Sequence, residues 1–197
     1  WEVRPIAECR ARTGKNPIGG RWVDHNKGDA TNPNVRCRYV AKDIAFWKDD
    51  AMFAAAPPLE ALRILLSDLA TSGRARVGGR RPGARKALLI DVRKAHLHAF
   101  VSEDVYVALP PEVAEPGMCA KLVRSLYGTR AAPARWEALY TETLESFGFI
   151  RGKASACCFY HPEREVRCVV HGDDFTFTGH DEDLDWVQHQ MESHFLC

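Results

Sequence analysis

The sequence predicts an α+β fold, and two observations lead to this prediction. Segments typical of strands and segments typical of amphipathic helices both occur along the 197 residues. They do not alternate in the strict β-α-β order that builds a parallel sheet. The hydrophobic content of 46% is high enough to bury a core, which favours one domain or one compact pair of subdomains.

The first part of the chain, residues 1–42, is expected to form strands and turns. Turn-forming residues cluster at 13–17 and 28–34. The segments that suit strands are 21–23 and 36–40.

A helix is expected after Pro57-Pro58, with Gly73 as its stop. Its apolar face has the i, i+3, i+4, i+7 spacing and consists of Leu62, Leu65, Leu66 and Leu69. Residues 74–86 are rich in Arg and Gly and lack periodicity, which predicts a mobile basic loop. A tolerated surface insertion is the favoured interpretation of this loop, and long-range attraction to phosphates is the alternative.

The second half of the chain is expected to contribute four more strands and two helices. The apolar runs that predict strands are 87–90, 105–109, 168–170 and 175–177. The helices are expected at about 134–147, closed by Gly148, and at 182–195.

The strongest local feature is Asp173-Asp174, at the expected tip of a hairpin between two apolar strand arms. Adjacent carboxylates repel each other, and their position at the end of hydrophobic strands raises that cost. A bound divalent cation is the simplest compensation. The alternative is an Asp-Asp turn in solvent, because Asp is a common hairpin residue.

Asp91 also ends an apolar strand, and this changes the balance between those alternatives. Two such strands side by side in one sheet would bring three carboxylates to one edge. Phosphoryl transfer by two metal ions needs that arrangement. Mg²⁺ is the expected ion, because it prefers a few carboxylate oxygens together with waters and phosphates. The alternative role for Asp91 is an N-cap of the segment that starts near Lys94.

Composition sets wider limits on function. Lys+Arg and Asp+Glu number 27 and 26, so the net charge of +1 neither favours nor excludes a nucleic-acid partner. The seven cysteines lack C-x-x-C spacing and favour reduced thiols in an intracellular protein, with zinc binding a weaker interpretation. No apolar run reaches the roughly 18 residues of a membrane span, and no signal peptide opens the chain.

Seven segments, in order, resemble the reverse transcriptase domain of Ty1/copia retrotransposons. In the first half they are Arg21-Trp22-Val23 with Lys27 ("RWV-x-x-x-K"), residues 36–42 ("KARLVAKG"), and Phe53-Ala54 with Leu59 to Leu66 ("F-x-P-V" and "iR-x-LL"). In the second half they are residues 91–95 ("DVKTAF"), residues 103–106 ("EEVYM"), residues 121–136 ("KL-x-x-x-LYGLKQAPRxW"), and Gly148-Phe149 with Asp173-Asp174 ("YVDD"). Any one match is weak, whereas seven in order are strong.

The resemblance implies a right-hand polymerase of fingers and palm, with an antiparallel palm sheet backed by helices. The fingers would comprise about 1–86 and 113–150, and the palm about 87–112 and 151–197, all within one reverse transcriptase domain. The thumb is expected to be incomplete or absent. The resemblance also implies a fragment of a Pol polyprotein, with integrase upstream and RNase H downstream.

The resemblance also implies roles for individual residues. The catalytic carboxylates would be Asp91, Asp173 and Asp174, and together with Val92 they would bind two Mg²⁺ ions, with Mn²⁺ as an alternative. Arg36 and Arg38 would clamp the incoming triphosphate, because guanidinium forks match phosphate oxygens. Without the resemblance, these two arginines would be read as solvated strand residues. The remaining substrate-binding residues would be His96, Arg130 and Ala131, and those near the primer end would be His171 and Gly172.

Three positions depart from the family pattern. His171-Gly172 replaces Tyr-Val, which removes an aromatic ring beside the primer end and is expected to loosen the hairpin. His96 replaces a Phe whose ring lies under the sugar, so weaker discrimination against ribonucleotides is expected. Ala131 stands where the family has Gln, and the absence of that Gln side chain is expected to lower the rate of polymerisation without abolishing nucleotide binding.

The sequence therefore predicts an RNA-directed DNA polymerase that extends a primer 3′-hydroxyl on an RNA or DNA template, using deoxynucleoside triphosphates. The polymerase is expected to act in the process that ends in DNA integration. Its expected location is a cytoplasmic particle or the nucleus, and no membrane partner is expected. The first alternative is a catalytically degenerate remnant that still binds nucleic acid. The second is another two-metal phosphotransferase or nuclease, although Arg36 and Arg38 weigh against it because a nuclease needs no triphosphate clamp.

Overall fold

The computed structural model describes residues 1–44, 54–71 and 85–197. Phe53, the expected helix stop Gly73 and most of the basic loop lie outside these residues. The chain divides into two compact units. Unit 1 consists of Trp1–Phe53 and His96–Trp136, and unit 2 consists of Ala54–Ala95 and Glu137–Cys197.

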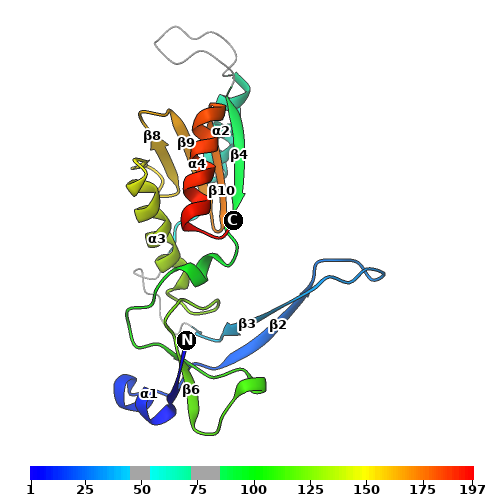
Figure 1. The fold of residues 1–197 in the computed structure, drawn as a ribbon, viewed down its shortest axis with the longest axis vertical. Coiled ribbons are helices and arrows are strands. Elements are labelled where there is room, and N and C mark those ends of the chain that lie inside the picture. Colours follow the sequence, from blue (N-terminus) through cyan, green and yellow to red (C-terminus); the bar gives the residue numbers. More distant parts are fainter. Residues whose placement is uncertain (45–53, 72–84) are drawn as a thin grey trace. The chain divides into compact units, whose positions relative to one another are not determined.

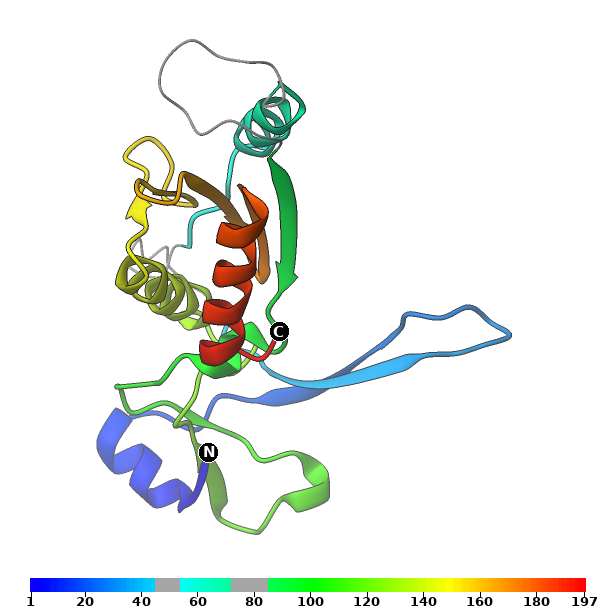
Figure 2. The ribbon, with the colours of Figure 1, turned by 45° about the horizontal axis from the view of Figure 1, so that its top comes forward.

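Unit 2 is built on a five-stranded antiparallel sheet with the strand order β4-β10-β9-β8-β7 (Figure 1). The strands are β4 (Lys86–Asp91), β7 (Ile150–Arg151), β8 (Cys158–His161), β9 (Val166–His171) and β10 (Asp174–Gly179). The helices in or entering this unit are α2 (Leu59–Thr71), α3 (Ala132–Ser146) and α4 (Asp181–His194). Figure 2 shows α4, in red, running along the sheet.

The central strand β10 separates two different environments. Phe175 and Phe177 are fully buried on one face, where their rings stack on each other and Phe175 meets Tyr140 of α3 edge to face. Leu184 of α4 packs near Gly179 on the same face. Residues 174, 176 and 178 point to the other face, because side chains alternate along a strand. The packed face forms the core, and the start of α2 covers part of the other.

Unit 1 contains a three-stranded sheet with the order β1-β6-β5 and a separate two-stranded hairpin, β2-β3. The strands are β1 (Glu2–Pro5), β2 (Gly20–Asn26), β3 (Val35–Ala41), β5 (Tyr106–Val107) and β6 (Met118–Lys121). The helical segments are α1 (Ile6–Thr13), η2 (Ala95–His98) at the boundary of the units, and η3 (Pro111–Val113).

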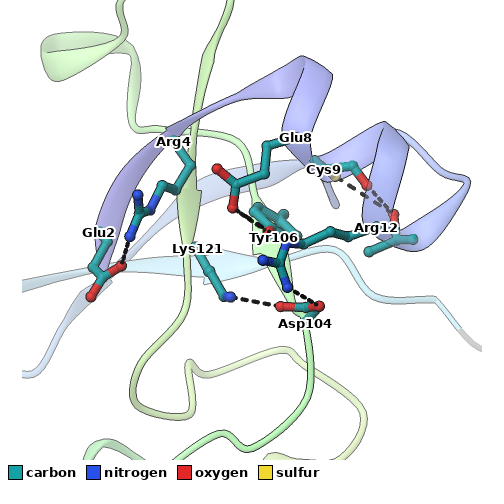
Figure 3. A network of polar contacts seen from close by, with 9 residues as sticks. Glu2, Arg4, Glu8, Cys9, Arg12, Asp104, Tyr106 and Lys121 are labelled. Carbon is teal, nitrogen blue, oxygen red and sulfur yellow. Dashed lines mark hydrogen bonds and ion pairs between the residues drawn. The ribbon is translucent and has the colours of Figure 1, made fainter.

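A polar network holds α1 to the three-stranded sheet (Figure 3). The hydroxyl of Tyr106 donates a hydrogen bond to Glu8 at 2.8 Å. Arg12 and Lys121 both pair with Asp104, at 3.2 and 2.6 Å. The contacts of Glu8 with Tyr106 and of Arg12 with Asp104 join residues 98 and 92 positions apart, so they stabilise the unit only once the chain has folded.

Most of the expected elements are present, and the main error lies near the N-terminus. The helices expected after Pro57-Pro58, near 134–147 and near 182–195 are confirmed as α2, α3 and α4. The strand that ends on Asp91 and the hairpin around residues 172–173 are also confirmed. The expectation of only strands and turns in residues 1–42 was wrong, because Ile6–Thr13 forms helix α1. All seven cysteines are free thiols.

Candidate functional site

Strand pairing in unit 2 brings the three predicted carboxylates together at one end of the sheet. Asp174 lies directly opposite Asp91 in the antiparallel register of β10 and β4. Residues paired in this way have Cβ atoms roughly 5 Å apart and point to the same face. The N–H of Val92 donates a hydrogen bond to the carbonyl of Asp173 at 3.0 Å, which extends the pairing by one step.

The turn before Asp174 has a geometry that favours glycine. His171 and Asp174 are the paired ends of a two-residue hairpin turn formed by Gly172 and Asp173. Gly172 has φ +66°, whereas Asp173 does not have a positive φ. A positive φ at only the first central position is the pattern of a type II′ turn, which favours glycine there.

Asp91 and Asp174 are exposed, and Asp173 is half-buried. Asp91 and Asp174 line a groove of about 580 Å³ beside the start of α2. His171 and the apolar side chains of Leu62 and Val169 also line it. Within the described residues, no side chain forms an ion pair or hydrogen bond with any of the three carboxylates. Their mutual repulsion is therefore not offset by a protein cation.

The types of donor present, three carboxylates, are those that Mg²⁺ prefers. The ion prefers carboxylate oxygens and keeps several of its waters, so two facing carboxylates and a third in the adjoining turn are a suitable donor set. Across residues 1–44, 54–71 and 85–197, no three His, Cys, Asp or Glu side chains lie in an arrangement that could hold a metal ion. The assignment of metal ligands, Val92 included, stays a prediction.

The segment that follows Asp91 is held by the C-terminal residues. The Arg93 N–H donates to the carbonyl of Leu196 at 2.7 Å, and its guanidinium donates to the carbonyl of Cys197. Burial, followed by the negative charge of Glu192, raises the pKa of the Cys197 thiol, and the charge of Asp91 adds to this effect. Asp91 and Cys197 line one pocket together with Arg93 and Glu192.

In unit 1, Arg36 and Arg38 lie on β3 of the β2-β3 hairpin, as expected. They are two residues apart and so share one face of the hairpin. Arg36 is exposed, whereas Arg38 is half-buried with its guanidinium 5.1 Å from the centre of the Tyr127 ring.

Tyr127 also connects Arg38 to another predicted substrate residue. The imidazole of His96 lies 4.6 Å from the centre of the same tyrosine ring. Arg38, Tyr127 and His96 therefore form one continuous cluster within unit 1. Tyr127 belongs to the "LYG" part of the motif at residues 121–136, and no role was predicted for it from the sequence. The motif itself was the signal that could have identified it.

The turn that carries Tyr127 is held against the end of β3 by three hydrogen bonds. The Ala41 N–H donates to the carbonyl of Tyr127 at 2.8 Å, and the Asp43 N–H donates to the carbonyl of Gly128 at 3.3 Å. The Arg130 N–H donates to the Asp43 carboxylate at 2.9 Å. Gly128 has φ +84°, and a Cβ atom there would lie 2.1 Å from the carbonyl oxygen of Ala41.

The last two predicted substrate residues follow this turn. The backbone of Arg130 is fixed by Asp43, as described above, and its side chain is half-buried. Ala131 immediately precedes α3, and its carbonyl accepts a hydrogen bond from the Arg135 N–H at 3.0 Å. Unit 1 thus contains all five predicted substrate-binding residues, and unit 2 contains all three carboxylates with His171 and Gly172.

Comparison with known families defines the class of protein. Residues 9–197 match the family described as reverse transcriptase (RNA-dependent DNA polymerase), and the chain belongs to that family. The similarity inferred from the seven segments is confirmed by named relatives, and the chain is a Ty1/copia-type reverse transcriptase fragment.

Two of these relatives come from plant transposons. The chain is 28% identical, over 87% of its own length, to the Retrovirus-related Pol polyprotein from transposon TNT 1-94 of Nicotiana tabacum. It is 30% identical, over 48% of its length, to the Retrovirus-related Pol polyprotein from transposon RE1 of Arabidopsis thaliana. The chain spans only 13% and 7% of these relatives. Among the described residues, no helix is both long and apolar enough to cross a membrane.

Proposed function

We propose that this chain is an RNA-directed DNA polymerase that transfers nucleotides to a primer 3′-hydroxyl. The five-stranded sheet of unit 2 would be the palm sheet, and the β2-β3 hairpin of unit 1 would belong to the fingers. The observation that carries the proposal is the β-sheet register, in which Asp91 of β4 lies directly opposite Asp174 of β10. This register places two carboxylates that form no ion pair on one face of one sheet. Membership of the reverse transcriptase family supports the same reaction.

The carboxylates would hold two Mg²⁺ ions, or Mn²⁺ in their place, with Asp173 as the third donor. When bound, such ions lower the pKa of an attacking hydroxyl and neutralise the phosphates that react. The protein's own contribution is the fixed spacing of its donors. Asp91 and Asp174 are each fixed by strand pairing, so their positions do not depend on the metal.

The cluster in unit 1 would bind the incoming deoxynucleoside triphosphate. Arg36 and Arg38 offer planar guanidinium donors that match phosphate oxygens. Arg38 is oriented by the face of Tyr127, and the His96 ring packs against that same tyrosine. In this proposal His96 contacts the sugar, Tyr127 holds both groups in place, and Arg130 and Ala131 support the bound nucleotide from the next turn. A primer and an RNA or DNA template complete the substrates.

Primer extension on an oligo(dT)-primed poly(rA) template, with and without Mg²⁺, tests this function. The key variants are Asp174→Asn and Asp91→Asn. Each removes a proposed metal ligand and is expected to lower extension by on the order of 100-fold or more, because even loss of an outer-shell partner costs 10–100-fold. Asp185→Asn is the matched control, since Asp185 is an exposed carboxylate of α4 in the same unit.

Mn²⁺ binding, measured by electron paramagnetic resonance, gives a second readout that does not depend on activity. We expect Asp174→Asn to weaken Mn²⁺ binding and Asp185→Asn to leave it unchanged. Metal binding without extension would favour the catalytically degenerate alternative. Extension that survives both Asp91→Asn and Asp174→Asn would refute the assignment of the carboxylates.

A further inference from the structure

The sheet of unit 2 carries a second cavity, in addition to the groove beside Asp91 and Asp174. It has a volume of about 550 Å³ and lies between α2 and strands β7, β8 and β9, with Leu65 and Val169 in its lining. Val169 pairs with Thr176, so it lies on the face of the sheet away from the phenylalanine core. Small-molecule sites typically have volumes of roughly 300–1,000 Å³. The cavity is therefore large enough to hold one compact organic molecule.

Two exposed isoleucines from different elements line this cavity. Ile64 of α2 is 69% exposed, and Ile150 of β7 is 60% exposed. Leu65, the next residue of α2, is only 3% exposed, because it packs on the sheet and leaves Ile64 at the side of the cavity. Single exposed apolar side chains are ordinary, whereas those that gather around one hollow mark a binding surface. An apolar ligand in the cavity would remove both isoleucines from water.

The charged side chains around the cavity disfavour a charged ligand. The guanidinium of Arg167 donates to the carboxylate of Asp68 at 2.5 Å, so this arginine already has an anionic partner. A second arginine, Arg85, lies 3.9 Å from the same carboxylate. Glu60 lines the cavity from the exposed first turn of α2 and would repel an anion, whereas the two arginines would repel a cation. Because transfer of a charge out of water is costly without a partner, the cavity suits an uncharged molecule.

One polar group in the lining can orient such a molecule. Tyr160 pairs with Arg167 in the register of β8 and β9, and the centre of its ring lies 5.8 Å from the Arg167 guanidinium carbon. Its hydroxyl forms no hydrogen bond with any residue that the structure describes. A phenol hydroxyl donates one hydrogen bond and can also accept. Tyr160 therefore offers a hydrogen-bond donor to a ligand that carries a carbonyl or another acceptor.

We propose that this cavity binds an uncharged, largely apolar small molecule, which contacts Ile64 and Ile150 and accepts a hydrogen bond from Tyr160. The site requires no metal ion, nucleotide or nucleic acid, so the inference does not rest on the proposed polymerase function. Burial of the part of each isoleucine that is now exposed is expected to contribute about tenfold to affinity. The hydrogen bond is expected to contribute about fivefold.

The test uses the whole 197-residue chain and Prodan, an uncharged naphthalene that carries a ketone and whose fluorescence shifts in apolar surroundings. Prodan is titrated in EDTA, without nucleotides or nucleic acid. Ile64→Asn and Ile150→Asn are each expected to weaken binding by about tenfold, and Tyr160→Phe by about fivefold. Leu66→Asn is the matched control, since Leu66 is an exposed leucine of the same helix that does not line the cavity. Circular dichroism melting confirms that each variant remains folded.

Two comparisons make the outcome decisive. The anionic probe 1-anilinonaphthalene-8-sulfonate is expected to bind more weakly than Prodan, and tighter binding of the sulfonate would overturn the choice of an uncharged ligand. Undetectable binding of Prodan, or equal weakening by Leu66→Asn and Ile64→Asn, would overturn the site itself. Sedimentation velocity tests a second copy of the chain as the occupant. A monomer supports the proposal, whereas a dimer that Ile64→Asn separates would overturn the choice of a small molecule.

Discussion

Replacement of Gly128 by alanine is expected to destabilise unit 1 far more than replacement of other glycines with a similar backbone. Gly128 has φ +84°, and a left-handed conformation costs an L-residue about 1–2 kcal/mol. A Cβ atom would also lie 2.1 Å from the carbonyl oxygen and 3.0 Å from the amide nitrogen of Ala41. Both neighbours are backbone atoms, so the turn must move as a whole.

That movement would weaken the three hydrogen bonds that join residues 127–130 to Ala41 and Asp43. At about 1 kcal/mol for each hydrogen bond, and with the dihedral cost added, the expected loss is roughly 4 kcal/mol. This is a large share of the 5–15 kcal/mol that typically separates folded from unfolded states. Urea unfolding, followed by tryptophan fluorescence, measures the change in free energy.

Gly14→Ala is the matched control. Gly14 has φ +67°, but a Cβ atom there would meet nothing within 4 Å, so only the dihedral cost of about 1–2 kcal/mol applies. The difference between the two variants isolates the contact with Ala41. If Gly128→Ala lowers the free energy of unfolding by no more than Gly14→Ala does, the Tyr127 turn does not pack closely on β3.

Three other predictions concern the cluster and the network of unit 1. Tyr127→Leu removes the ring that Arg38 and His96 both contact, so it is expected to raise KM for the incoming nucleotide by about tenfold, equivalent to about 1.4 kcal/mol. Tyr127→Phe keeps the ring and is expected to leave KM unchanged. Equal effects of the two variants in steady-state kinetics would contradict this prediction. His96→Phe is expected to increase the preference for dNTP over rNTP in primer extension, and unchanged selectivity would remove the idea. Burial, followed by the hydrogen bond to Glu8, raises the pKa of Tyr106 to about 12, so the fold favours the neutral phenol. The contribution of the neutral Tyr106 phenol to the free energy of unfolding is fully present below pH 10 and is lost as the pH rises to about 12. Between these pH values, Tyr106→Phe should lose less stability than the wild type, as measured by circular dichroism.

The amphipathic and strand-ending patterns were predictable because they are local. The leucine spacing of α2 and the apolar run before Asp91 each lie within a few residues and do not depend on distant partners. Helix α1 left no such pattern. Cys9 is its only buried residue, so no apolar stripe marks its inner face. Its position depends on contacts such as Glu8 with Tyr106, 98 residues away, which no local window contains.

In the candidate site too, local patterns were predictable from the sequence and contacts between distant residues were not. The approach of Asp91 and Asp174 followed from two apolar strands that end on carboxylates, although their direct register could not be read from either strand alone. The contacts that Tyr127 makes with Arg38 and His96 join three distant segments, and no local pattern near Tyr127 predicts them. Resemblance to a family identifies which positions matter, whereas packing determines which side chain supports another.

Gly172 was expected to loosen the hairpin of β9 and β10, and this stays a prediction, but glycine also suits the backbone of this turn. A β-branched residue in place of Gly172 would be strained at φ +66°, whereas glycine adopts this conformation without cost. The position of Asp174 also does not depend on the turn residue. Pairing of β10 with β4 runs over six residue pairs, from Asp174 opposite Asp91 to Gly179 opposite Lys86, and a one-residue slip would move Phe175 and Phe177 out of the core. The buried phenylalanines therefore fix the register of the carboxylates. Divergence at residues 171–172 changes what surrounds the carboxylate pair without separating it.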